Sequence, residues 1–205
     1  MNRQAIIEKV KMKLDEYTPI DEGIGHPLDS YIDPSLNDAA IRLLKDAPLA
    51  KLNSTIIIGT EANLVFLPVP NDPNNRIVLF SCQGDVLRMK SIWLPQWESP
   101  VMVFYPYNSD MALFQHNPYT RAGIKKPVVI EQRSADGLKY TCYTHPEVNE
   151  TNFSAECITK LKPEEIQDDL IEPLVYLAAS MVASIMEMGT VATALYNEYA
   201  KILTS

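Results

Sequence analysis

Glycine and cysteine are scarce in this chain, and each shortage narrows what the protein can be. It has seven glycines against fifteen prolines, which argues against flexible linkers and predicts stiff, extended connections. Its three cysteines, Cys82, Cys142 and Cys157, are odd in number and widely spaced, so we expect buried, reduced thiols rather than a disulfide framework. A chain of 205 residues can bury roughly 70% of its unfolded surface and needs neither disulfides nor a metal to fold.

Long hydrophobic runs are also missing. The longest apolar stretch, residues 174–186, covers about 13 positions, whereas a membrane-spanning helix needs roughly 20. The first fourteen residues contain neither a long apolar core nor a small-residue cleavage site, which predicts that there is no signal peptide. We therefore expect a protein that stays in the cytoplasm of whatever cell makes it, with no membrane partner.

Basic residues are absent from one long part of the sequence. The net charge of −8 argues against binding nucleic acid through phosphate contacts, and no Lys or Arg lies between Lys162 and Lys201. Seven acidic residues fall in that stretch: Glu164, Glu165, Asp168, Asp169, Glu172, Glu187 and Glu198. They form either an ordinary solvated helix face or a surface that repels a polyanion or meets a basic partner.

Residue patterns that signal catalysis are missing too. His26, His116 and His145 stand far apart, and none has a Cys or acid at metal-ligand spacing. No nucleotide-binding, zinc-protease or serine-hydrolase motif is present. The pairs Glu164/Glu165 and Asp168/Asp169 are explained by the first turns of a helix, where the helix dipole favours acids. We expect no enzyme, no cofactor and no metal.

The order of the predicted elements is two helices, a β-rich middle and two more helices. We place the helices at 2–17, 33–47, 163–188 and 190–203, and the β-rich insertion at about 53–160, within a single domain of residues 1–205. The fold class is α+β: a bundle of N- and C-terminal helices with an antiparallel β-rich insertion.

Prolines and apolar spacing set the details of these helices. Asp33-Pro34 predicts the start of the second helix, and Pro173 predicts either a kink in the third or a restart after a short first turn. Residues 174–186 are apolar nearly all round, so this helix is buried in its own core or between subunits.

The β-rich part carries two clear local patterns. Asp136-Gly137, set between apolar runs, predicts a hairpin over residues 128–143, because this dipeptide accepts the backbone angles of a tight turn. Residues 86–93 alternate apolar and polar side chains, which predicts a strand with one wet face, and proline-rich residues 68–75 predict a loop.

Aromatic residues and prolines cluster between positions 93 and 119, where no basic side chain lies before Arg121. Core packing explains such a cluster as well as a protein–protein interface does, whereas stacking on nucleotides would need nearby cations. The interface candidates are Trp93, Trp97, Tyr105, Tyr107, Tyr119, Arg121, Tyr196 and Tyr199.

Several short motifs, taken in order, resemble the head-to-tail connector proteins of tailed bacteriophages, closest to podovirus-like phages including the crAss-like group. They are Ile32 to Leu44 (IDPSLNDAAIRLL), Asp85 to Lys90 (DVLRMK), Ile92 to Trp97, Glu98 to Val101, Gln115 to Tyr119 with Arg121 and Gly123, Lys126 to Val129 (KPVV), and the closing stretch Leu161 to Met186. The resemblance covers about three quarters of the chain. One departure is Gln83-Gly84, where the family has Leu-Pro before the aspartate.

The resemblance implies a structural virion protein: an adaptor ring, usually of about twelve copies, that binds the portal protein above and a tail or second ring protein below. It implies a role in tail assembly and genome ejection, with DNA passing through the lumen without specific binding. Residues 190–205 would be an arm for docking on the portal. Two alternatives stay open: a small-molecule enzyme or ligand-binding domain, and a regulatory module that grips another protein through the aromatic stretch without ring symmetry.

Overall fold

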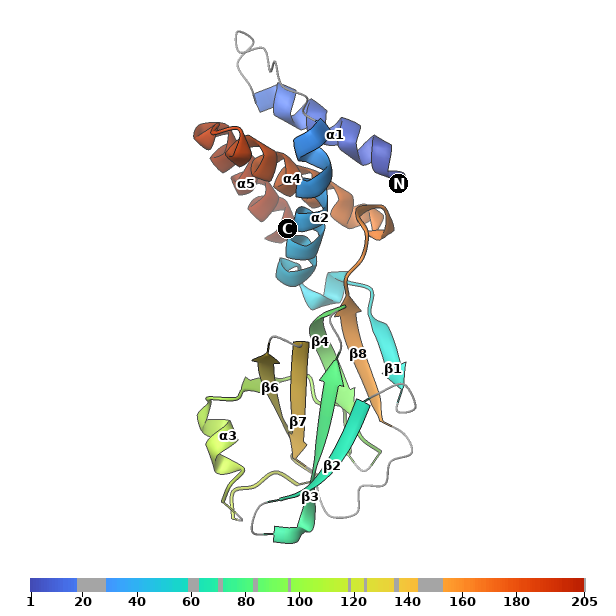
Figure 1. Ribbon diagram of the computed structural model, residues 1–205, viewed down its shortest axis with the longest axis vertical. Coiled ribbons are helices and arrows are strands. Elements are labelled where there is room, and N and C mark those ends of the chain that lie inside the picture. Colours follow the sequence, from blue (N-terminus) through green and yellow to red (C-terminus); the bar gives the residue numbers. More distant parts are fainter. Residues whose placement is uncertain are drawn as a thin grey trace. The chain divides into compact units, whose positions relative to one another are not determined.

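The structure, a computed structural model, shows two compact units built from one chain (Figure 1). It describes residues 1–17, 29–58, 63–69, 72–82, 85–95, 97–117, 119–123, 125–134, 137–143 and 153–204. Met1–Asn53 and Lys160–Ser205 form a helical unit, and Ser54–Thr159 form a strand-rich unit. The predicted α+β class, with terminal helices flanking a strand-rich middle, is confirmed. Where the sequence predicts one domain with an insertion at about 53–160, the contacts within the chain define two units.

The helical unit is organised around its most apolar helix. α1 (Arg3–Tyr17), α2 (Asp29–Asp46) and α5 (Gly189–Thr204) all pack on α4 (Ile171–Ile185). Eleven residues of α4 are buried by these neighbours, which accounts for a helix that is apolar nearly all round. Of the two alternatives, burial in its own core is therefore the one that the structure supports. At the start of α1, the Asn2 side chain accepts a hydrogen bond from the Ala5 N–H (2.8 Å) and caps the helix.

Two predicted helix boundaries are corrected by the structure. α2 begins at Asp29 rather than residue 33, so Pro34 lies inside the helix, exposed to solvent, and deprives it of one intrahelical hydrogen bond. The helix predicted over 163–188 is broken into 3-10 turns at Pro163–Glu165 and Asp168–Leu170, followed by α4. Pro173 is the third residue of α4, where a backbone N–H would have no partner, so the chain restarts rather than kinks.

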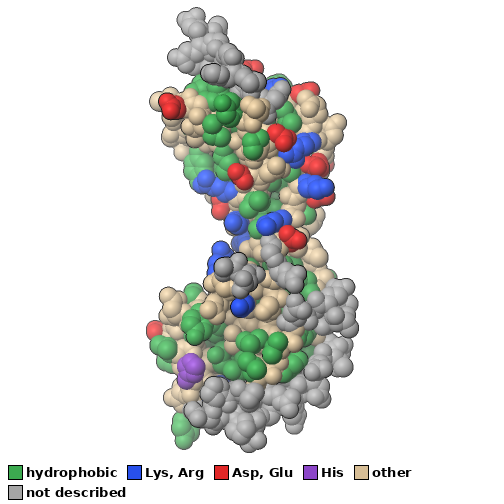
Figure 2. Space-filling model, in the orientation of Figure 1, with side chains coloured by type: hydrophobic (Ala, Val, Ile, Leu, Met, Phe, Trp, Pro, Cys, Tyr) green, Lys and Arg blue, Asp and Glu red, His purple; other side chains and the backbone are tan. Residues whose placement is uncertain are grey.

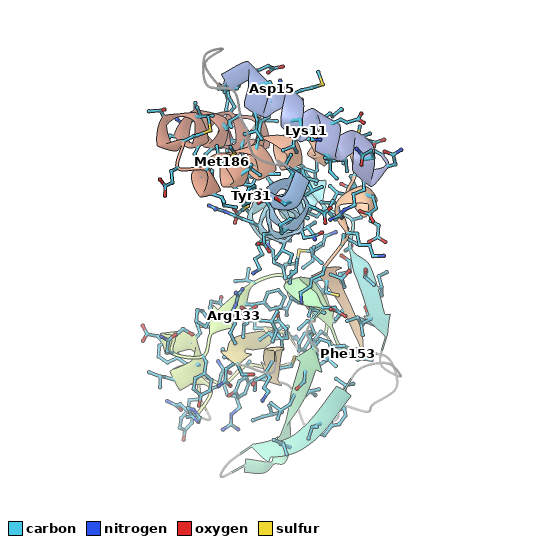
Figure 3. All side chains as sticks on the ribbon, turned by 45° about the horizontal axis from the view of Figure 1, so that its top comes forward. Lys11, Asp15, Tyr31, Arg133, Phe153 and Met186 are labelled. Atoms are coloured by element: carbon cyan, nitrogen blue, oxygen red, sulfur yellow. The ribbon has the colours of Figure 1, made fainter. Side chains whose placement is uncertain are left out.

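The strand-rich unit consists of two sheets that share one core. The smaller sheet has the order β1-β8-β4 and the larger has β2-β3-β7-β6-β5. Their bounds are β1 Thr55–Ile58, β2 Asn63–Val69, β3 Asp72–Cys82, β4 Val86–Trp93, β5 Phe104–Pro106, β6 Val128–Ser134, β7 Gly137–Tyr143 and β8 Ser154–Thr159. Side chains from both sheets fill the space between them. Phe153, labelled in Figure 3, packs its ring against Phe80 with the centroids 4.6 Å apart.

The strand pairing departs from the prediction in two places. The insertion is not wholly antiparallel, because β5 runs parallel to β6 and the connection between them, residues 107–127, contains the short helix α3 (Asp110–Phe114). The predicted loop at 68–75 is mostly strand: β2 extends to Val69 and β3 begins at Asp72, with a register shift after Pro68. Pro68 fits because β2 is an edge strand, which needs hydrogen bonds on one side only.

The hairpin and the alternating strand are as predicted. β6 and β7 are paired from Val128↔Tyr143 to Ser134↔Gly137, whereas Asp136 falls outside the described residues. In β4, Leu87, Met89 and Ser91 are buried, and a register shift between Met89 and Ser91 brings the next residue, Ile92, inward as well. That bulge explains why the alternation of buried and half-buried residues breaks at residue 92.

Candidate protein-interaction surface

The structure distributes the predicted interface residues over both units and over very different degrees of burial. Trp97 and Tyr199 are almost fully buried, and Trp93, Tyr105 and Arg121 are half-buried. Only Tyr107, Tyr119 and Tyr196 are exposed enough to meet a partner directly. Tyr196 and Tyr199 belong to α5 in the helical unit, while the other six belong to the strand-rich unit.

The two tryptophans serve the fold of the strand-rich unit. The Trp93 indole N–H donates a hydrogen bond to the Trp97 carbonyl oxygen at 3.2 Å. The Trp97 ring lies in the core between the sheets, and its own indole N–H finds no acceptor in the described part of the chain. A buried donor without an acceptor costs free energy, so the ring is held there by packing.

The two tyrosines of α5 connect that helix to α2. The Arg42 guanidinium lies 5.2 Å from the centroid of the Tyr196 ring and donates a hydrogen bond to its hydroxyl oxygen at 3.2 Å. The Tyr199 hydroxyl donates to the Asp46 carboxylate at 3.4 Å, and burial raises the pKa of Tyr199. Residues predicted as an interface here connect helices within the same chain, and the predicted arm at 190–205 is largely α5 packed on α4.

The most exposed aromatic side chain stands on a loop that hydrogen bonds hold in place. Gln115, only 1% exposed, donates from its side-chain amide to the Met111 carbonyl oxygen (2.9 Å) and accepts from the Ala122 N–H (2.9 Å). The Arg121 Nε donates to the Gln115 carbonyl oxygen at 3.1 Å. Gln115 thus fastens both ends of residues 115–122, which we call the aromatic loop.

Two further hydrogen bonds shape the middle of the aromatic loop. The Thr120 hydroxyl donates to the Phe114 carbonyl oxygen at 2.9 Å, and the Asn117 side-chain oxygen accepts from the Tyr119 N–H at 3.0 Å. Tyr119 itself is 97% exposed. An aromatic ring that is hardly buried by its own chain and is carried on a hydrogen-bonded loop is a feature typical of protein–protein anchors.

Other apolar side chains accompany this ring. Leu113 and Phe114 of α3 are 65% and 50% exposed, while Met111 and Ala112 of the same helix pack on β6. Met102, Val103 and Tyr107, beside the ends of β5, are exposed as well. Sequence reasoning found Tyr107 and Tyr119 but missed Leu113, Met102 and Val103, because nothing in their spacing marks them as exposed. Gln115 belongs to the connector-like motif, but a single sequence gives no indication that this glutamine is buried.

The ionisable groups of the described residues offer no obvious nucleophile or metal site. Burial raises the pKa of Cys82 to about 12 and also raises the pKa of Cys142 and Cys157, so all three remain protonated thiols at neutral pH. No group of three or more His, Cys, Asp or Glu side chains suited to a metal occurs in the part of the chain that was searched. His116 is exposed within the aromatic loop; His26 and His145 lie outside the described residues.

Some of the clustered acids have structural roles. Glu164 pairs with Arg3 at 3.3 Å, and Glu165 accepts a hydrogen bond from the Lys162 N–H at 2.9 Å. Asp168, Asp169, Glu172 and Glu187 are exposed. The acidic stretch is therefore partly a set of local contacts and partly a solvated surface.

No family model matches the chain, and no curated protein matches its sequence significantly. Of the helices within the described residues, none has both the length and the apolar character required to cross a membrane.

Proposed function

We propose that this chain is a structural subunit of a bacteriophage head-to-tail connector, a ring that joins the portal protein to the tail in the virion. The observation that carries the proposal is the aromatic loop. The segment whose sequence resembles the connector motif is held by two hydrogen bonds of the Gln115 side chain, and it exposes Tyr119 almost completely. Such an arrangement gives a preorganised surface for binding protein, and it offers nothing evident to transform a substrate.

Each unit has its own hydrophobic core, which supports assembly from subunits that are already folded. α4 is buried by helices of the same chain, and the two sheets share a core within residues 54–159. A folded subunit loses less conformational freedom when it docks than one that must fold at the interface. Ring formation would then depend on exposed side chains such as Tyr119.

The charge distribution supports a ring through which DNA moves without being held. The helical unit has sixteen acidic and ten basic residues, whereas the strand-rich unit has ten and eight. Acids that line a lumen repel phosphates and let DNA slide. The exposed acids near the start of α4, Asp168, Asp169 and Glu172, are candidates for such a lining.

Native mass spectrometry and negative-stain electron microscopy of the purified chain, alone and with a portal protein, test this proposal. We expect a closed ring of about twelve copies with a central hole. A chain that stays a monomer with the portal, and that is missing from purified phage particles, would contradict it. A pairwise complex with one other protein, without a ring, would instead support the regulatory alternative. No observation in the described residues favours the small-molecule enzyme.

A further inference from the structure

The larger sheet has an outer face, turned away from the core that the two sheets share. Because side chains alternate along each strand, residues paired across the sheet form rows on that face. One row crosses β2, β3, β7 and β6 as Val65, Leu79, Thr141 and Ile130, and the next as Leu67, Ile77, Tyr143 and Val128. Neither row contains a charged side chain, which is unusual for a sheet face that meets water.

Only part of this outer face is covered by the same chain. Over β6 and β7, side chains from β5, α3 and the aromatic loop pack on Val128, Ile130 and Tyr143. Over β2, Val65 and Leu67 remain 51% and 42% exposed, and Ile77 and Leu79 of β3 are only half-buried. Figure 2 shows hydrophobic side chains gathered in the middle of the strand-rich unit, over β2, β3 and β7. We call Val65, Leu67, Ile77 and Leu79 the open face.

α3 and the aromatic loop present apolar side chains in two directions. Met111 and Ala112 pack on the outer face of their own sheet, whereas Leu113, Phe114 and Tyr119 extend into solvent. This projection lies by β5 and β6, at one end of the strand order β2-β3-β7-β6-β5, and the open face lies at the other end. Both belong to the strand-rich unit, so each copy carries the two surfaces at opposite edges of one sheet.

We propose that Leu113, Phe114 and Tyr119 of one copy pack on the open face of a second copy, head to tail. The inference rests on the proposed function, because a ring requires a heterologous contact in which two different surfaces of each subunit meet. In a closed ring, every projection and every open face is buried, and no apolar surface of either kind remains in water.

The two surfaces together supply the apolar centre of an interface between copies. With roughly 200 Å² for each large apolar side chain, Leu113, Phe114 and Tyr119 present about 400 Å², and Val65 and Leu67 of the open face present about 200 Å². A stable interface buries about 800 Å² on each partner, so a more polar rim around these side chains would supply the remaining area. The open face lacks charge in both rows, so it suits an apolar projection better than a charged peptide or nucleic acid.

Mixing two complementary variants tests the contact directly. Tyr119→Asp damages the projection and leaves the open face intact, whereas Leu67→Lys does the reverse, and both positions are exposed enough to accept the change. By native mass spectrometry, each variant alone should lose the wild-type oligomer, with at least a tenfold weaker self-association. Their mixture should form a dimer with one copy of each and stop there. Ile56→Lys is the matched control and should assemble as the wild type does, because Ile56 is an exposed (59%) apolar residue on β1 of the other sheet.

Disulfide trapping is a second, independent test of the contact between copies. The native thiols are buried, so Tyr119→Cys and Val65→Cys supply the accessible ones. We expect a covalent dimer under mild oxidation when the two single variants are mixed, and far less from either alone. If the wild type forms rings while the two cysteine variants give no cross-link and Tyr119→Asp still assembles, this contact is overturned and the proposed function stands. A chain that is monomeric at every concentration and gives no cross-link would also overturn it, and the portal-binding experiment would then decide the proposed function separately.

Discussion

Replacing Gly137 with alanine should destabilise the strand-rich unit more than any other glycine substitution at a described position. Gly137 is the first residue of β7 and has φ +123°, a backbone conformation that side chains with a Cβ rarely adopt. A Cβ built there would lie 2.6 Å from the carbonyl oxygen of Cys82 on the neighbouring strand β3. That neighbour is backbone at the end of an inner strand, paired on both sides, and cannot move aside cheaply.

The size of the effect follows from the unfavourable φ angle and from the close contact with the Cys82 carbonyl oxygen. A residue forced into such a conformation costs about 1–3 kcal/mol, and relief of the contact requires β3 and β7 to separate by several tenths of an ångström. We expect a loss of about 3 kcal/mol in the free energy of unfolding. With a denaturant slope of about 2 kcal/mol per molar urea, the midpoint should fall by about 1.5 M.

Tryptophan fluorescence during urea unfolding is the suitable measurement. Trp93 and Trp97 are the two tryptophans of the chain, and both lie in the strand-rich unit, so their emission reports on that unit. Gly123→Ala is the matched control: a Cβ there meets nothing within 4 Å, and the midpoint should change little or rise slightly. If the Gly137→Ala midpoint coincides with that of the control, the reasoning about this close approach is wrong.

Three other predictions follow from buried polar groups. Ser180→Ala removes the hydrogen bond from the serine hydroxyl to the Ala192 carbonyl oxygen (2.9 Å), which links α4 to α5. The free energy of unfolding should fall by about 1 kcal/mol, measured by thermal melting with circular dichroism at 222 nm. An unchanged melting temperature would refute this prediction. The free energy of unfolding should be highest below pH 9 and should fall as the pH rises further. In the unfolded chain Cys82 ionises with its ordinary pKa of 9.0, and Tyr140 and Tyr199 with 10.0, whereas burial raises all three pKa values in the folded protein. A urea midpoint that is equal at pH 8 and pH 10.5 would contradict this prediction. Ellman's reagent at pH 8 should label no cysteine in the native protein and all three in urea, and fast labelling of the native protein would contradict their burial.

Much of the fold could be predicted from the sequence because its signals are local. The Asp136-Gly137 pair and its apolar flanks predict the hairpin of β6 and β7, and the terminal helices follow from apolar spacing. Boundaries were less predictable where tertiary packing overrides a local preference. Pro34 is a strong helix-start signal, yet α2 begins earlier because packing against α4 compensates for one lost hydrogen bond.

The candidate surface could be predicted only in part, because burial depends on distant pairing. Trp97 and Tyr119 are both aromatic residues near prolines, and nothing local separates the buried ring from the bare one. The difference arises from the sheets: Trp97 falls between them, whereas Tyr119 stands on a connection outside. Predicting the open face from sequence requires the strand pairing as well, because Val65 and Leu79 become neighbours only when β2 pairs with β3.

Gln115 and Tyr119 allow the shape of the aromatic loop to be separated from its binding. Gln115→Leu removes both side-chain hydrogen bonds and leaves the Met111 carbonyl and the Ala122 N–H without these partners, at a cost of about 1–3 kcal/mol each. The loop should then open more often, and trypsin should cut after Arg121 at least tenfold faster than in the wild type. Gln115→Glu can still accept from Ala122 but cannot donate to Met111, so its cleavage rate should be intermediate. Tyr119→Ser should leave cleavage slow yet weaken self-association, because the ring makes little contact with its own subunit. Equal trypsin rates for all four proteins would show that the hydrogen bonds of Gln115 do not hold this loop.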